Sequence, residues 1–513
     1  MDARTTAPPV STAAAATTGI SVTRGGIWNA ASNLTPQLCT MAISVAGARF
    51  LGPSGLGRQS FIAFVVAMSW NVFALGMPVA LMRTVGEALG AGREAEAQGL
   101  VRWAWRIGVG LAAVAGAVLL GVAAAGAKPQ AAWYLAAATA ALGVLAAFPG
   151  AALTGLQRWR GLALTIITAN VLSAATTILV LALGGGITGM IAVQLGAAVY
   201  IFAGVTLLAR RHIAALAPRP ADPGPLRRST IRYAGVTFAG SLVTLIVFRR
   251  SEFFFLEHYA NDRRLALYSV SFAAVTTLVL VPQALAGAVS PAFATLYGAG
   301  QHERIRSGYS RSLRLLLIAG LPVTAGALAL GPRTLRLVFG NSFAGTRVPL
   351  LILLAPLPLI PLMNASYSLI VGLGKKRFPL LVGAGSAALN VALDFALIPR
   401  HAEIGAAIAN SCAQGATAAV TLAYGVKLTG GVRWETPALL RAALASAGAG
   451  AVAWGMLDLV GSAPGVVAGL LAGLAGFAAL AVTLRILAAD DARWLAESFG
   501  GRAARVARLL SPS

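Results

Sequence analysis

The 513-residue sequence predicts an all-α polytopic membrane protein with about 14 transmembrane helices. Hydrophobic residues make up 58% of the chain and charged residues only 11%, and the mean hydropathy is +0.78. A soluble domain leaves too much of its surface in water to carry such a composition. Lipid tails, by contrast, solvate apolar side chains directly. Apolar runs of about 20 residues, the length that spans a bilayer, recur along the whole chain.

Fourteen such runs follow one another along the sequence. They cover residues 27–50, 59–82, 103–126, 131–151, 162–183, 187–208, 233–257, 265–297, 312–331, 346–373, 379–398, 403–425, 437–459 and 464–488. If the N-terminus is cytoplasmic, alternation of the connecting loops places most of the 40 Lys and Arg residues on the cytoplasmic side. We therefore expect a multi-pass protein of the inner (plasma) membrane with its N-terminus and C-terminus in the cytoplasm.

The sequence also repeats itself weakly. A shift of 217 residues overlays the fourth to sixth runs on the tenth to twelfth without a gap, and the basic turn 157–160 then falls on the basic turn 374–377. An offset of six spans gives the two halves the same orientation, as in a parallel repeat whose pseudo-two-fold axis lies along the membrane normal. The prediction is two six-helix lobes followed by two extra C-terminal helices.

The predicted domain boundaries follow from these runs and from changes in composition. The connection between the lobes is rich in proline and arginine, which is typical of a linker, and the chain ends in a basic amphipathic stretch suited to an anionic membrane surface. The expected parts are a flexible N-terminal tail 1–22, an N-lobe 23–208, a cytoplasmic linker loop 209–232, a C-lobe 233–425, the last two spans 436–488 and a basic cytoplasmic tail 489–513.

The net charge of +24 does not indicate nucleic-acid binding, because no basic run is interleaved with aromatic residues in a soluble segment. Loop arginines that follow the positive-inside rule explain the charge better. The sequence holds no Walker A, HExxH or GxSxG pattern and no metal-ligand spacing. We expect no enzyme activity, no catalytic residues, no cofactor and no metal.

Four stretches resemble the oligosaccharide flippase family of the multidrug/oligosaccharidyl-lipid/polysaccharide exporter superfamily. They are residues 26–29 leading to 48–57, residues 82–92, residues 267–272 with 291–294, and residues 390–399 with 404–409. The resemblance runs from about residue 22 to residue 425 and implies a MATE-like fold.

The same resemblance implies a function. It is that of a flippase that moves a polyprenyl-pyrophosphate-linked oligosaccharide across the inner membrane by alternating access, for surface polysaccharide biosynthesis such as the O-antigen of lipopolysaccharide. The implied partners are the lipid-linked oligosaccharide, membrane lipids and a polysaccharide polymerase or glycosyltransferase, and the implied oligomeric state is a monomer.

Arginine is suited to such a substrate, since its planar guanidinium binds phosphate through two hydrogen bonds and lowers the cost of bringing that charge into the membrane. The seventh run carries Arg249, Arg250 and Glu252 within an apolar stretch. Arg249 and Glu252 are three residues apart and can pair, which leaves Arg250 for phosphate. The alternative is that these side chains lie at the outer interface and extend into water. Arg49, at the end of the first run, is either a substrate ligand or an interfacial anchor.

Two further sets of polar residues complete the predicted site. Asn29, Asn33 and Gln37 give the first run a polar face that can line a substrate cavity, although amide residues also serve ordinary helix packing. Arg83 and Glu87, four residues apart, are candidates for a cytoplasmic gate, and a solvated surface pair is the alternative.

Other functions remain open on the sequence alone. A flippase for the lipid-linked peptidoglycan precursor or a drug/cation antiporter has the same fold, but an antiporter needs deep carboxylates and the first six runs hold none at mid-depth. A membrane glycosyltransferase usually has a large outer loop, and the outer connections here are short. Asp394 is a candidate ligand for a coupling ion, although a position at the membrane interface is the simpler expectation.

Overall fold

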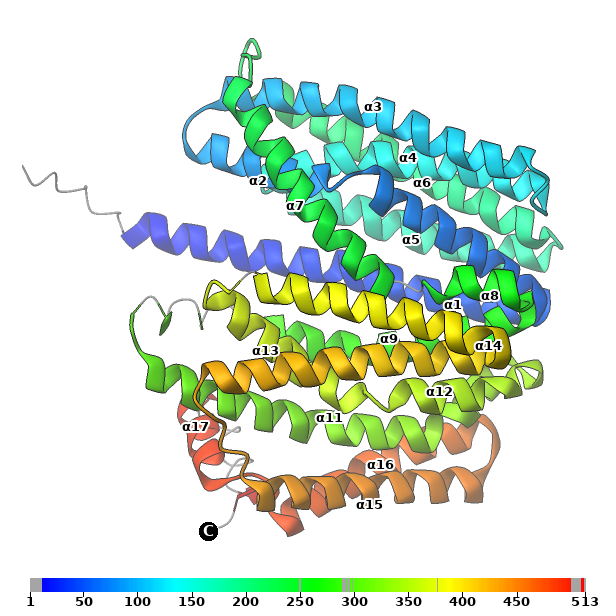
Figure 1. Ribbon diagram of the computed structural model, residues 1–513, viewed down its shortest axis with the longest axis vertical. Helices are drawn as coiled ribbons and strands as arrows, with labels where there is room; N and C mark the ends of the chain where they lie inside the picture. The colour runs from blue at the N-terminus through cyan, green and yellow to red at the C-terminus, as the bar shows by residue number, and fades with distance from the viewer. Residues whose placement is uncertain are drawn as a thin grey trace, which may run out of the picture. The chain divides into compact units, whose positions relative to one another are not determined.

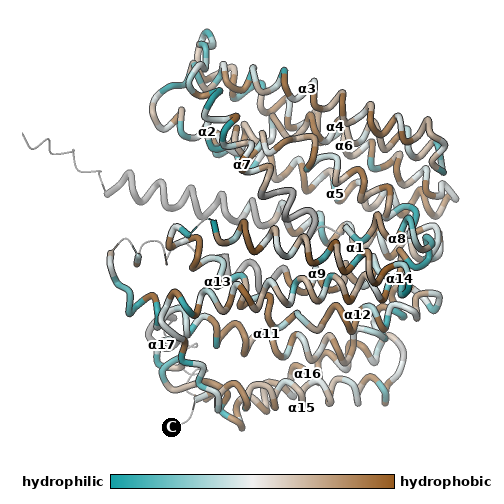
Figure 2. The backbone as a smooth tube through the Cα atoms, viewed as in Figure 1, coloured by the Kyte–Doolittle hydropathy of each residue, from teal (hydrophilic) through white to brown (hydrophobic). Residues whose placement is uncertain are grey.

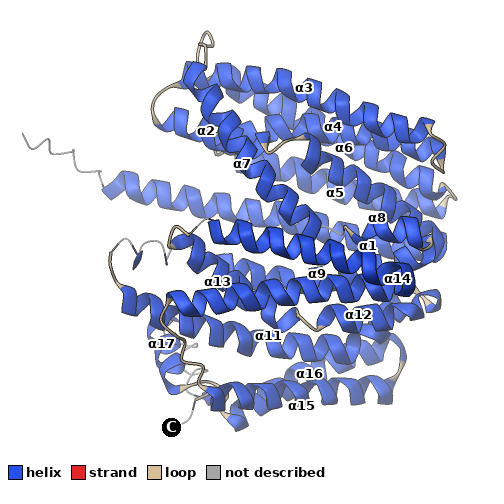
Figure 3. Ribbon diagram, in the orientation of Figure 1, coloured by secondary structure: helices blue, strands red, loops and turns tan. Residues whose placement is uncertain are grey.

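The protein, described here from a computed structural model, consists of α-helices joined by short turns (Figure 3). The structure describes residues 12–248, 251–287, 293, 296–297, 299–375, 377–499 and 509–511, and within these ranges it contains no strand. Apolar runs of this length form helices because a helix satisfies every backbone hydrogen bond internally, as lipid requires. The all-α prediction is confirmed.

The chain forms two compact units, and the first comprises Met1–Ala46 and Ile62–Leu242. Two elements, α1 and α7, run on into the second unit. The helices of this part are α1 (Thr12–Phe73), α2 (Met77–Gly90), α3 (Glu94–Ala124), α4 (Gln130–Gly155), α5 (Trp159–Ala182), α6 (Gly186–Ala214) and α7 (Gly224–Phe248).

The second unit comprises Gly47–Phe61 and Val243–Ser513. Short 3₁₀ turns at Asn341–Thr346 and Leu357–Leu359 flank one of its helices, α12. The helices are α8 (Glu252–Tyr259), α9 (Asp262–Gly287), α11 (His302–Phe339), α12 (Arg347–Leu354), α13 (Ile360–Gly372), α14 (Arg377–Leu428), α15 (Thr436–Val460), α16 (Ser462–Leu484) and α17 (Ala489–Phe499).

Nine helical segments among the described residues are long and apolar enough to cross a membrane, or up to ten if Leu34–Phe73 and Met77–Gly90, bent by 46°, form one span. The described residues of each of the fourteen predicted runs fall mainly on helical segments, and α14 alone covers the eleventh and twelfth runs. α7 and α9, which cover most of the seventh and eighth runs, are not among the nine. The multi-pass membrane prediction is confirmed, while the count of fourteen stays a prediction.

A sharp break divides α14 into two antiparallel limbs (Figure 1). Ala402 has φ 44° and ψ −120°, and Pro399 precedes it within the same helix, where it removes a backbone hydrogen bond. At the far ends of the limbs the rings of Phe378 and Tyr424 stack with centroids 3.7 Å apart. Because both limbs rise at the same rate from the break, residues equally distant from it lie at the same level.

The hydropathy of the helices fits a lipid environment. Apolar residues lie along their lengths and polar residues concentrate at turns and helix ends (Figure 2). On the α15–α16 hairpin, Leu444, Leu459 and Leu471 are 64%, 83% and 62% exposed. Large apolar side chains exposed in such numbers are unfavourable in water and favourable against lipid tails.

The α17 helix is fixed to α11 by a buried ion pair. The Asp491 carboxylate accepts hydrogen bonds from Arg314 at 2.8 and 2.5 Å and from Arg311 at 3.2 Å, and Asp491 is fully buried. Arg314 also donates to the carbonyl of Arg433, and the Arg311 guanidinium lies 5.1 Å from the ring centre of Trp494. These contacts tie together α11, the α14–α15 turn and α17.

Replacing Asp491 by alanine should destabilise the protein by about 3 kcal/mol or more, because it leaves the buried Arg314 guanidinium without its counter-charge. The measurement is the unfolding temperature of the purified protein in detergent. The matched control is Asp490→Ala, since Asp490 pairs with Arg493 at the exposed surface and should contribute little. Equal unfolding temperatures for the two variants would contradict the structural role of the Asp491 pair.

Candidate functional site

The most unusual feature of the second unit is a pair of fully buried carboxyl groups, Glu252 and Asp394. Glu252 opens α8, and Asp394 lies on the first limb of α14. The amide nitrogen of Asn390 lies 3.2 Å from Glu252 Oε1 and 3.4 Å from Asp394 Oδ2, so one side chain contacts both acids. From the second limb of α14, Asn410 donates to Glu252 Oε1 at 2.8 Å. We call Glu252, Asn390, Asp394 and Asn410 the acidic cluster.

The break in α14 explains how the acidic cluster forms. Asn390 lies 12 residues before Ala402 and Asn410 lies 8 residues after it, and in the two antiparallel limbs both amides reach Glu252 Oε1. Gln414 donates to Asn410 Oδ1 at 2.5 Å, which turns the Asn410 amide nitrogen toward Glu252. Asn390 and Asn410 are both fully buried.

The cluster offers more acceptors than donors. Asn390 Oδ1 and Asp394 Oδ1 are buried and have no hydrogen-bond donor among the described residues. Hydroxyl groups add to the site, since Tyr268 interacts with Glu252 and Ser251 interacts with Asp394. Across the described part of the chain, neither acid forms an ion pair with Lys, Arg or His.

Two adjacent carboxylates in a low-dielectric interior repel each other and lose their hydration, so they are not both charged without compensation. A proton on one of them, or a monovalent cation bound between their oxygens, supplies that compensation. Carboxylate and amide oxygens are the ligands that such hard cations prefer. The geometry of the acidic cluster therefore suits reversible binding of a proton or a small cation.

The predicted residues of the seventh run are only partly described. Arg249 and Arg250 lie outside the described residues, so their roles as phosphate ligands stay predictions. Glu252, which the sequence paired with Arg249, contacts Asn390 and Asn410 in the structure.

Arg49 has a defined structural contact. Its Nε donates to the Val338 carbonyl at 2.9 Å, and its Nη2 donates to the Leu337 carbonyl. These are among the last carbonyls of α11, which have no partner inside their own helix. The side chain is exposed, so a contact with substrate stays a prediction alongside this capping role.

The polar face of the first run is described at one of its three predicted positions. Gln37 is exposed on α1, while the side chains of Asn29 and Asn33 lie outside the described residues. The cavity-lining role of all three stays a prediction.

Arg83 and Glu87 form an ion pair at 2.6 Å one turn apart on α2, with side chains 52% and 48% exposed. The Arg83 guanidinium also lies 4.5 Å from the ring centre of Tyr233 on α7. An exposed pair of this kind contributes little to stability. Its assignment as a gate stays a prediction.

Asp394, for which a position at the membrane interface was the simpler expectation, is fully buried in the acidic cluster, while its depth in the membrane stays a prediction. The sequence did carry a signal for this cluster. Asn390 and Asp394 are four residues apart in one apolar run, and Asn410 and Gln414 are four apart in the next, so each pair lies on one helix face. What the sequence could not show is that both faces meet Glu252, which lies far away in the chain.

Several solved structures are similar in fold to this chain. The lipid II flippase MurJ in an inward closed conformation has a TM-score of 0.69 at 15% identity and covers 89% of this chain and 98% of its own. An inward-facing MATE family multidrug resistance transporter of the MOP superfamily has a TM-score of 0.61 at 17% identity and covers 79% and 94%. A MOP superfamily transporter from Pyrococcus furiosus has a TM-score of 0.57 at 16% identity and covers 80% and 95%.

At these identities the likeness concerns the fold, and it confirms the predicted MATE-like architecture. No curated protein sequence matches the chain. The family model described as "Polysaccharide biosynthesis protein" matches residues 47–347, more than half of the chain. This range includes α8 with Glu252 and overlaps most of the stretch in which the sequence resembles oligosaccharide flippases. The chain belongs to this family of polysaccharide biosynthesis proteins.

Proposed function

We propose that the protein is a flippase that moves a polyprenyl-pyrophosphate-linked oligosaccharide across the inner membrane for surface polysaccharide biosynthesis. The family assignment supports a role in polysaccharide synthesis, and the fold is shared with a protein described as a lipid II flippase. Transport proceeds by alternating access and is driven by a proton or cation gradient that acts on the acidic cluster. In this scheme the protein is a transporter and not an enzyme.

The observation that carries the energy-coupling part of the proposal is the buried pair Glu252 and Asp394. Such a pair is costly to maintain and contributes nothing to stability that apolar residues would not provide better. Ionisable groups inside membrane proteins commonly mark ion and proton pathways. A gradient across the membrane changes the occupancy of the cluster, and different occupancies favour different conformations. The sequence has no nucleotide-binding motif that would supply energy from ATP.

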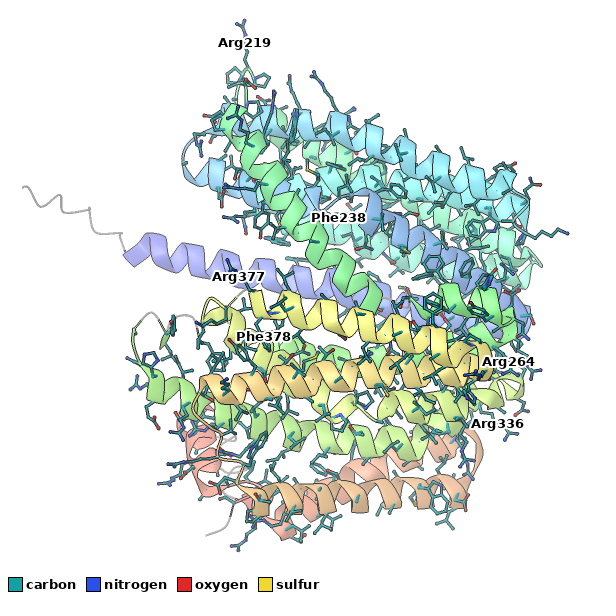
Figure 4. All side chains as sticks on the ribbon, viewed as in Figure 1. Arg219, Phe238, Arg264, Arg336, Arg377 and Phe378 are labelled. Atoms are coloured by element: carbon teal, nitrogen blue, oxygen red, sulfur yellow. The ribbon has the colours of Figure 1, made fainter. Side chains whose placement is uncertain are left out.

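The long-range ion pairs of the second unit fit the proposed topology. Arg58 with Glu257, Arg264 with Glu403, and Arg333 with Asp458 each join two connections that the loop-charge rule places on the outer side. Arg314 and Asp491 join two connections placed on the cytoplasmic side. Each of these ion pairs therefore joins residues from loops that are predicted to lie on the same side of the membrane. Figure 4 shows Arg264 and Arg336 at one end and Arg377 and Phe378 at the other.

Two rivals share the fold. The likeness to MurJ keeps a peptidoglycan precursor flippase open, and the buried carboxyls of the second unit remove one argument against a drug/cation antiporter. The family model favours the polysaccharide substrate over both. The three functions differ in which compound accumulates when the protein is lost.

The proposal predicts that a deletion strain accumulates lipid-linked oligosaccharide in the inner leaflet and loses surface polysaccharide. The parent gene should restore export. Asp394→Asn should lower it at least about tenfold at equal protein level, because the neutral amide cannot exchange a proton and binds a cation more weakly than a carboxylate does. The control is Asp458→Asn, which removes an exposed ion pair and should export normally. Accumulation of a peptidoglycan precursor would instead indicate a peptidoglycan precursor flippase. Drug sensitivity with normal surface polysaccharide would indicate a drug/cation antiporter.

Arg250→Ala should abolish export at the protein level of the parent, because it removes the guanidinium proposed to bind the pyrophosphate within the membrane. The measurement is surface polysaccharide in the complemented deletion strain. Arg263→Ala removes an exposed arginine nearby in the sequence and should leave export unchanged. Full export by the Arg250→Ala variant would contradict the assignment of Arg250 as a phosphate ligand.

Cation binding at the acidic cluster should appear as added stability in the purified protein. If the coupling ion is Na⁺, the unfolding temperature should rise as NaCl replaces choline chloride, by the equivalent of about 2.7 kcal/mol at a concentration of roughly 100 times Kd. Glu252→Gln should be at least as stable as the parent without the ion, since it removes the repulsion between two acids, and should lose the response. If protons are the coupling ion, no response to Na⁺ is expected and the parent should gain stability as the pH falls, while Glu252→Gln should show a smaller gain. A parent that responds to neither would overturn the coupling proposal.

A further inference from the structure

Residues 47–61, which we call the strap, pack within the second unit although the chain on both sides of them belongs to the first. Within the strap, α1 is interrupted at Gly52, whose φ of 67° is readily adopted only by glycine. Close backbone contact holds it in place. A Cβ atom at Gly57 would collide with the carbonyl oxygen of Asp262, so only glycine lets the strap approach the α8–α9 turn this closely.

Next to Gly57, Arg58 contacts two carboxylates at once. Its guanidinium lies 2.6 Å from Glu257 Oε1 at the end of α8 and 3.1 Å from Asp262 Oδ1 at the start of α9. The three side chains are only about a quarter exposed, which makes the interaction stronger than that of a surface pair. One ring contact extends it, since Phe61 of the strap meets Phe254 of α8 edge-on at 6.2 Å.

The α8 helix joins this contact to the acidic cluster. It has only eight residues, with Glu252 at its first position and Glu257 at its sixth, about 7.5 Å further along the axis and roughly 140° around it. Its neighbouring rings also point different ways, because Phe255 contacts Phe395 of α14 at 4.7 Å while Phe254 contacts the strap. The α8 helix therefore lies between α14 and the strap, and a shift of this short helix changes both contacts.

We propose that Arg58 is a positioning residue that transmits the occupancy of the acidic cluster to the strap through α8. This inference rests on the proposed coupling by a proton or cation. With the cluster neutralised, α8 is held against α14 and both carboxylates are in place for Arg58. When the ion leaves, repulsion between Glu252 and Asp394 moves α8 away from α14, and the contact between Arg58 and Glu257 is lost.

The location of the Arg58 contact indicates what the movement of α8 would do. The loop-charge rule places the α8–α9 turn and the part of the strap around Arg58 on the outer side of the membrane. The other end of the strap is anchored independently, by the Arg49 side chain on the last carbonyls of α11. Release of Arg58 therefore frees one end of the strap while the other stays fixed, which is the behaviour of a gate on the outer side.

The experiment measures exposure of the strap as a function of coupling ion. Ser54, exposed on the strap, is replaced by cysteine after the native Cys39 and Cys412 are changed to serine, and alkylation by a charged maleimide is timed in detergent. The ion used is whichever of Na⁺ and H⁺ stabilises the purified parent. Because the maleimide reaction itself depends on pH, each alkylation rate is divided by the rate of a free thiol at the same pH.

In the parent background the alkylation rate should fall at least about threefold as the ion is added. Arg58→Gln should give a fast rate that no longer depends on the ion, Glu257→Gln should do the same, and Arg58→Lys should restore part of the response because it keeps the charge. Arg264→Gln is the matched control. It breaks an ion pair between α9 and α14 at the same end of the unit and should leave the response intact.

Two outcomes separate the inference from the proposed function. An unchanged ion response in Arg58→Gln and Glu257→Gln would overturn the role of Arg58 and leave ion coupling standing. Thermal stabilisation by the ion with no change in strap alkylation in the parent would also overturn it. A parent that binds neither Na⁺ nor protons at the acidic cluster would remove the coupling proposal and this inference together.

Discussion

The second unit is organised by one constraint, which is that charge taken out of water requires a partner. Asp491 satisfies it with two arginines and serves as a fixed attachment for α17. Glu252 and Asp394 do not satisfy it with any basic residue among the described ones and have amide and hydroxyl neighbours instead. The Asp491 ion pair is therefore a permanent structural contact, whereas the acidic cluster needs a bound proton or cation to balance its charge.

The break in α14 makes the second arrangement possible. A single long helix would place Asn390 and Asn410 about 30 Å apart along its axis, whereas two antiparallel limbs bring them to the same carboxylate region. The same turn places Glu403 within 3.0 Å of Arg264, so the end of the α14 limbs at the break is tied to α9. One local backbone feature thus positions both the acidic cluster and one of the ion pairs around it.

The general architecture was readable from the sequence because hydropathy acts locally. Runs of about 20 apolar residues become helices wherever they occur, and the predicted break between the eleventh and twelfth runs coincides with Ala402. The acidic cluster was not readable in the same way. The pairing of Glu252 with its helical neighbour Arg249 stays a prediction, because Arg249 lies outside the described residues. That Glu252 and Asp394 lie in one cluster could not be predicted, because a sequence shows spacing within one helix but not which helices meet. Asn390 and Asn410 drew no attention as site residues, although their four-residue spacing to Asp394 and Gln414 marked a shared face.

The composition of the α14 limbs has a consequence for how the chain enters the bilayer during synthesis. A lipid-exposed Asp394 would cost up to about 3 kcal/mol, the value that insertion scales give for a helix centre, and Asn390, Asn410 and Gln414 add to the cost of inserting their own limbs. The two limbs are joined across the turn at Ala402 by hydrogen bonds from Ser386 to the Ala413 carbonyl and from Thr417 to Ser386, so each limb covers polar groups of the other. The two limbs are therefore expected to enter the membrane together as a helical hairpin. The turn at Ala402 then serves the insertion of the chain as well as its folded structure.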